Sequence, residues 1–81
     1  EINYKPIFNQ NDKIKLLKLE CFLTDVSDRM TRDNPLSNYF LSIVKEKLGK
    51  KEDANQRKII VKEYLEKSDY WVQRFKTLNL N

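Results

Sequence analysis

Four carboxylates occur in pairs that could do acid–base chemistry. Asp25 and Asp28 are three residues apart, as are Glu63 and Glu66, so each pair lies on one side of a helix. Neighbouring carboxylates act as general acid and base only where a cleft moves their pKa values apart. On amphipathic helices such residues usually form a solvated face, and Glu63 also stands four residues before Lys67, an ordinary surface pair.

The residue types that most enzymes and metal sites need are missing from the 81 residues. The sequence has no histidine and one cysteine, Cys21, so it offers neither a histidine base nor the ligands of a zinc site. Its single glycine cannot build a glycine-rich phosphate-binding loop. We therefore predict that the protein is not an enzyme and has no cofactor and no metal.

The composition favours helices. The chain is 35% charged and 40% hydrophobic, with one glycine and two prolines, which are too few turn residues for an all-β fold. We predict an all-α fold, a small antiparallel bundle of three or four helices with an extended N-terminal arm, in one domain over residues 1–81.

The setting of the protein is predicted from its cysteine content and its apolar runs. A single cysteine cannot form an internal disulfide, which favours an intracellular location in the cytoplasm or nucleus. No apolar run is long enough to span a membrane. Because the chain starts at Glu1 rather than Met, we expect a domain excised from a larger protein.

The first helix is predicted over residues 12–30, after an extended arm at 1–10 that contains Pro6. Asn11 and Asp12 are good residues for the helix N-cap. Its main apolar stripe should face the core and consists of Leu16, Leu19, Phe22, Leu23, Val26 and Met30.

A second apolar stripe lies on nearly the opposite side of the same helix. It consists of Ile14, Leu17 and Cys21, at spacing i, i+3, i+7. A helix that is apolar on two sides is usually covered on two sides. This stripe therefore predicts a cover, supplied either by the N-terminal arm or by a partner.

The second helix is predicted over residues 35–48. Asn34 and Pro35 form a specific start, and Gly49 fits the left-handed residue that ends a helix. Most of its circumference is apolar, and a narrow polar strip consists of Asn38, Ser42, Lys45 and Glu46.

The third helix is predicted over residues 54–78, behind Asp53 and Gln56, which resemble a capping box. Ser68 lies in the middle of its apolar face. We expect it to bond back to a carbonyl inside one continuous helix, and the alternative is that it caps a fourth helix starting at Asp69. The core-facing residues are Ile60, Val61, Tyr64, Leu65, Trp71, Val72, Phe75 and Leu78.

The net charge of +4 lies entirely in residues 35–81 and is concentrated in a basic corner at residues 45–62. Two helices joined by a short turn at this corner could form a helix-turn-helix that reads bases from a major groove. The residues of this alternative nucleic-acid site are Lys50, Lys51, Asn55, Gln56, Arg57, Lys58 and Lys62.

The favoured function is a non-enzymatic protein–protein interaction module. Its binding surface is predicted at the second stripe of the first helix, or at Ile59 and Tyr70, which fall on the polar side of the third helix. The partner is another protein chain, with a second copy of this chain as one candidate, because a small domain can complete its core by dimerising. Trp71 is expected in the core, and its exposure would instead mark an anchor for the partner.

Overall fold

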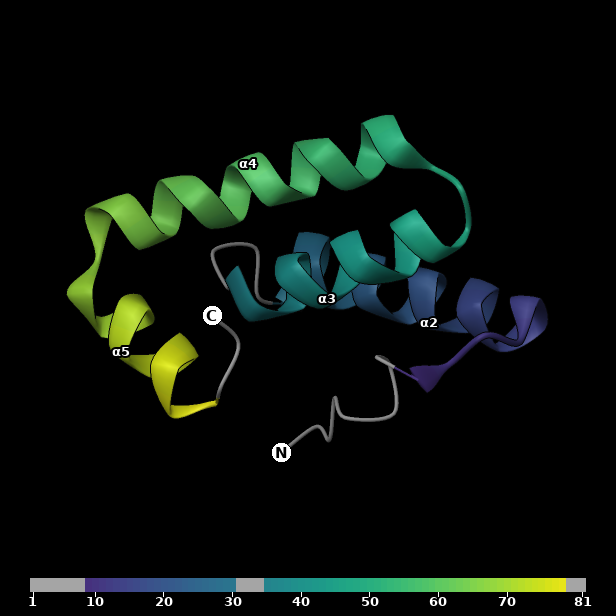
Figure 1. Cartoon of the computed structure of the whole chain (residues 1–81), viewed down its shortest axis with the longest axis horizontal. Coiled ribbons are helices and arrows are strands. Elements are labelled where there is room, and N and C mark those ends of the chain that lie inside the picture. Colours follow the sequence, from purple (N-terminus) through teal and green to yellow (C-terminus); the bar gives the residue numbers. More distant parts are fainter. Residues whose placement is uncertain (1–8, 31–34, 79–81) are drawn as a thin grey trace.

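The computed structural model describes residues 9–30 and 35–78 of the chain (Figure 1). Its elements are α2 (Lys13–Asp25), the π-helical turn η1 (Val26–Met30), α3 (Pro35–Lys47), α4 (Lys51–Lys67) and α5 (Asp69–Thr77). No strand occurs within these described ranges, and the predicted all-α bundle is confirmed. Residues 1–8 of the predicted arm and the predicted cap at Asn34 lie outside the described residues.

The first helix begins where the sequence predicts. The Asp12 carboxylate accepts hydrogen bonds from the backbone N–H groups of Ile14 (2.9 Å) and Lys15 (3.2 Å), which satisfies two donors at the start of α2. The helix then continues into η1 without a break. Together α2 and η1 span the predicted helix and pack against α3, with Leu16 and Leu23 of the predicted stripe buried.

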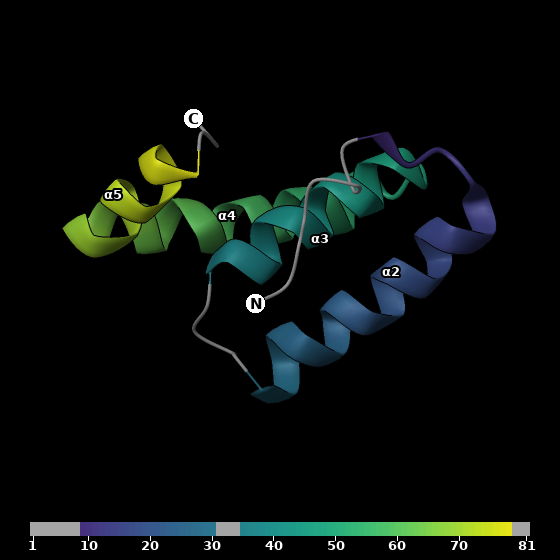
Figure 2. The same ribbon diagram turned by 90° about the horizontal axis from the view of Figure 1, so that it is seen from below.

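Helix α3 lies at the centre of the bundle, with α2 and α4 packed on different sides of it (Figure 2). This position buries polar residues for which the sequence predicts an exposed strip. Asn38 and Ser42 are buried, so that part of the prediction is wrong. Both are hydrogen-bonded, because the Ser42 hydroxyl donates to the Tyr39 carbonyl (2.6 Å) and the Asn38 side-chain oxygen accepts from Arg57 (2.9 Å).

Gly49 turns the chain between α3 and α4. Its φ is +81°, in the left-handed region that glycine adopts at no steric cost, as the sequence predicts. Helix α4 starts at Lys51, so the predicted capping box at Asp53 and Gln56 is wrong. Asp53 instead lies in the first turn, where a negative charge interacts favourably with the helix dipole.

The predicted continuous helix over 54–78 is also wrong, because the chain breaks at Ser68. This residue has φ −139° and ψ 113°, an extended conformation that separates α4 from α5. A straight helix over 54–78 would be about 37 Å long, whereas the 13 residues of α3 span about 20 Å. The break lets α5 turn back from the end of α4 (Figure 1). Phe75 of α5 is buried, and its ring lies 5.5 Å from that of Tyr39.

The core joins all four α-helices of the described chain. Its buried members are Leu16, Leu23, Leu36, Phe40, Leu41, Val44, Val61 and Phe75. Trp71 is half-buried and packs against this core, as predicted. Phe22 is an exception: the sequence places it in the core stripe, but its side chain is 48% exposed. Phe22 precedes the buried Leu23 and therefore points about 100° away from it around the helix. This direction lies outside the side of α2 that packs against α3.

Candidate functional site

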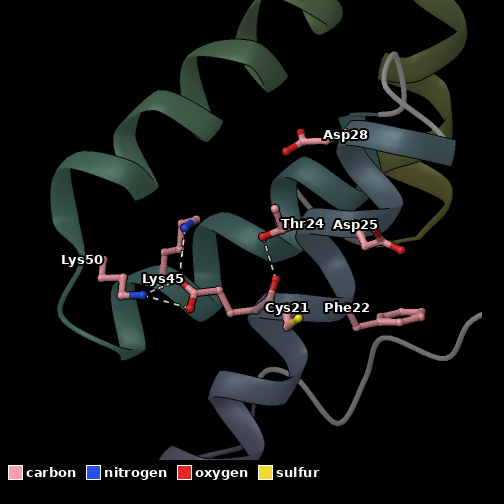
Figure 3. Close-up of a pocket in the computed structure, with 8 residues that line it drawn as sticks. Cys21, Phe22, Thr24, Asp25, Asp28, Lys45 and Lys50 are labelled. Carbon is pink, nitrogen blue, oxygen red and sulfur yellow. Dashed lines mark hydrogen bonds and ion pairs between the residues drawn. The ribbon is translucent and has the colours of Figure 1, made fainter.

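The second stripe of the first helix is exposed in the structure. Ile14 is 66% exposed and Leu17 43%, and Cys21 is also exposed. Phe22 is the other large apolar side chain exposed on α2. We call the side of the helix that carries Ile14, Leu17, Cys21 and Phe22 the outer face of α2, and the exposed Lys18 and Asp25 lie between Phe22 and the other three. No labelled helix covers this side of α2 (Figure 2), and Phe22 points to the opposite side of α2 from Lys45 and Lys50 (Figure 3).

An open groove of about 730 Å³ lies beside the outer face, between α2 and the turn that joins α3 to α4 (Figure 3). Its lining residues are Glu20, Cys21, Phe22, Thr24, Asp25, Asp28, Lys45 and Lys50. Cys21 and Phe22 of the outer face therefore also border this groove.

Glu20 is the electrostatic centre of this groove. Its carboxylate accepts hydrogen bonds from Lys45 Nζ (3.0 Å) and Lys50 Nζ (2.9 Å). Burial acts to raise the pKa of Glu20, but the two ammonium groups outweigh it and hold the pKa below its usual value. Glu20 is therefore a negative charge fixed by two lysines, which suits a structural role.

Most cations of the basic corner are paired inside the protein. Arg57 donates from Nη1 to Asp28 (3.0 Å) and to Asn38, Lys58 pairs with Glu46, and Lys47 donates to the Gln10 carbonyl (2.9 Å). Arg57 thus uses its guanidinium to join η1, α3 and α4. The remaining residues of the alternative nucleic-acid site are exposed on α4. Lys51, Asn55 and Gln56 lie in its first two turns, and Lys62 lies about three turns from its start.

Three lysines of α2 stand out by contrast. Lys13, Lys15 and Lys18, which we call the outer lysines, are exposed and make no ion pair with the described part of the chain. Sequence reasoning did not assign them to the site, because the charges of residues 1–34 cancel when they are counted along the chain. In the fold, Glu20 pairs with Lys45 and Lys50, and Asp28 pairs with Arg57, rather than with these lysines.

The other predicted surface is divided by the break at Ser68. Ile59 on α4 and Tyr70 on α5 are 55% and 65% exposed, but the continuous helix that would align them on one side does not form. Tyr70 makes an edge contact with the half-buried Trp71, with ring centroids 5.1 Å apart. The two residues are exposed individually, whereas the residues of the outer face share one helix.

The paired carboxylates lie on helix surfaces. Asp25, Glu63 and Glu66 are exposed, and Asp28 is engaged by Arg57. No group of three or more potential metal ligands of the histidine, cysteine or acidic type occurs among residues 9–30 and 35–78. Within the same ranges, none of the helices is both long and apolar enough to cross a membrane.

Comparisons with protein-family models, with curated proteins and with solved structures find no match to this chain. The geometry of the outer face is therefore the basis for assigning a function.

Proposed function

We propose that this protein is a non-enzymatic protein–protein interaction module and that the outer face of α2 is its docking surface. The observation that supports this is the exposure of Ile14, Leu17, Cys21 and Phe22 along one side of a helix whose other side holds the core. Several large apolar side chains exposed on one side of a helix in a small protein, with polar residues around them, are typical of interaction sites.

The mode of binding follows from the shape of the surface. A ridge of side chains along a helix suits a partner helix or a groove that takes anchors at i, i+3 and i+7. Leu17 and Phe22 are each about half exposed, so burying the rest of them at such an interface would contribute roughly 1 kcal/mol for each side chain. An intracellular setting fits the role, since the exposed Cys21 would stay reduced there.

The test is capture of partners from native lysate by the wild-type chain and by Leu17→Asp, with and without nuclease. We expect a partner that the wild type captures, that Leu17→Asp loses, and that nuclease does not remove. Ile59→Asp places the same charge on the exposed aliphatic residue of the other predicted surface. It should keep the partner, and loss of the partner in Ile59→Asp alone would move the docking surface to α4.

Thermal unfolding of both variants completes the experiment. Leu17→Asp should weaken binding more than it lowers the melting temperature, because Leu17 lies outside the core. If Leu17→Asp unfolds the domain, the stripe is core and the proposal fails. If nuclease removes the captured material, the protein binds nucleic acid through the basic corner instead.

A further inference from the structure

We propose that the partner docked on the outer face of α2 is an acidic amphipathic helix, with carboxylates beside its apolar stripe. This inference rests on the proposed function and names the chemistry of the partner. It is carried by the distribution of charge around the four apolar side chains of the face.

The first step concerns the acids that could neutralise the outer lysines from within the protein. Glu20 is bonded to Lys45 (3.0 Å) and to Lys50 (2.9 Å), on the side of α2 that meets α3 and α4. Asp28 is bonded to Arg57 (3.0 Å). Glu20 and Asp28 therefore offset the basic corner. The outer lysines make no ion pair with the described part of the chain, and Asp25 is the exposed acid on the same side of α2.

The second step concerns where the outer lysines lie. At about 100° per residue, Lys13 follows the edge of the face next to Leu17, Lys15 follows the edge next to Phe22, and Lys18 lies between them. Any partner that covers the apolar side chains must also approach these three ammonium groups. Carboxylates at the edges of its own apolar stripe would meet Lys13 and Lys15, and a carboxylate within the stripe would meet Lys18. These contacts would raise both association rate and specificity.

The third step compares other occupants of the same face. A second copy would bring three more outer lysines, and Asp25 is the exposed carboxylate it could offer from α2. An anionic membrane would attract the lysines, but it would also meet Asp25, which lies on the same side as Ile14 and Cys21. An acidic helix can carry its carboxylates at the positions that meet the lysines and carry none opposite Asp25. It therefore fits the outer face better than a second copy or a membrane does.

The test is selection from a displayed library of helical peptides, with the full chain as bait. We expect the enriched peptides to share apolar residues at i, i+3, i+4 and i+7 with Asp or Glu at the flanks. Leu17→Asp should lose them. The triple variant Lys13→Glu, Lys15→Glu, Lys18→Glu should bind the enriched acidic peptide at least about tenfold more weakly and should select basic flanks instead.

A matched control tests whether the change in net charge alone weakens binding of the acidic peptide. The triple variant Lys51→Glu, Lys62→Glu, Lys67→Glu makes the same change of charge at exposed positions of α4 and should still bind the acidic peptide. Circular dichroism of each variant confirms that the helices are retained.

Three results would overturn the inference. Peptides that depend on Leu17 but show no preference for acidic flanks would leave the proposed function standing and remove the acidic partner. Self-association in sedimentation that Leu17→Asp abolishes, with no peptide enriched, would make the occupant a second copy. Binding to phosphatidylserine vesicles but to no peptide would make it a membrane, and would also refute the proposed function.

Discussion

Arg57 of α4 and Asp28 of η1 face each other, with Nη1–Oδ1 at 3.0 Å and Nη2–Oδ2 at 3.4 Å. The same guanidinium donates to the side-chain oxygen of the buried Asn38 on α3 (2.9 Å). One side chain therefore connects three elements of the bundle. In the sequence Arg57 is a candidate for contacts with bases, whereas in the fold it supplies a donor to a buried polar group.

Removing this donor should destabilise the bundle. In Arg57→Ala, the buried oxygen of Asn38 loses a charge-assisted hydrogen bond, so we expect the free energy of unfolding to fall by about 1–3 kcal/mol. Lys58→Ala is the neighbouring control and should change it by less than about 1 kcal/mol, since its pair with Glu46 is exposed. Chemical denaturation of both variants measures the difference. Equal effects would show that the contact with Asn38 has no structural role.

Glu20 should make stability depend on pH. Burial acts to raise its pKa, but Lys50 and Lys45 lower it below the ordinary value of 4.5. A carboxyl whose pKa is lower in the folded state contributes stability above its unfolded pKa, and this contribution disappears as the pH falls through the folded pKa. The wild type should therefore lose stability in acid below about pH 4.5.

The comparison with Glu20→Gln isolates this contribution. At pH 7 we expect Glu20→Gln to be less stable by about 2 kcal/mol, because the half-buried Lys45 loses its closest anion. This difference should shrink as both proteins are titrated into acid, and denaturation curves at several pH values measure it. A difference that stays constant down to pH 2 would mean that the ion pairs of Glu20 contribute nothing.

Two buried serines should respond differently to the same substitution. The Ser27 hydroxyl in η1 is buried without a hydrogen-bond partner among the described residues, whereas Ser42 donates to the Tyr39 carbonyl (2.6 Å). Ser27→Ala removes an unsatisfied polar group and should raise the free energy of unfolding by up to about 1 kcal/mol. Ser42→Ala should lower it or leave it unchanged, and equilibrium denaturation compares the two. If Ser27→Ala is the more destabilising variant, the Ser27 hydroxyl has a partner in solution.

Local patterns in the sequence predict much of the helical framework. The cap at Asp12, the start at Pro35 and the left-handed Gly49 each depend on residues within one turn, so their types suffice. The apolar stripe of Ile14, Leu17 and Cys21 is likewise visible from helical spacing, and the structure finds these residues exposed. The start of α4 is the exception, since Asp53 and Gln56 resemble a cap but lie inside the helix.

Contacts between distant residues decided the rest. The sequence determined where apolar and charged residues repeat along each helix, because that repeat is a local property of the chain. Only the tertiary structure decided that the chain breaks at Ser68, since the gain comes from packing Phe75 against Tyr39 of α3. The tertiary structure also decided which charged residues pair with one another. Lys45 and Lys50 bond to Glu20, from which they are separated by 25 and 30 residues of sequence. A local sequence pattern cannot predict such a pairing.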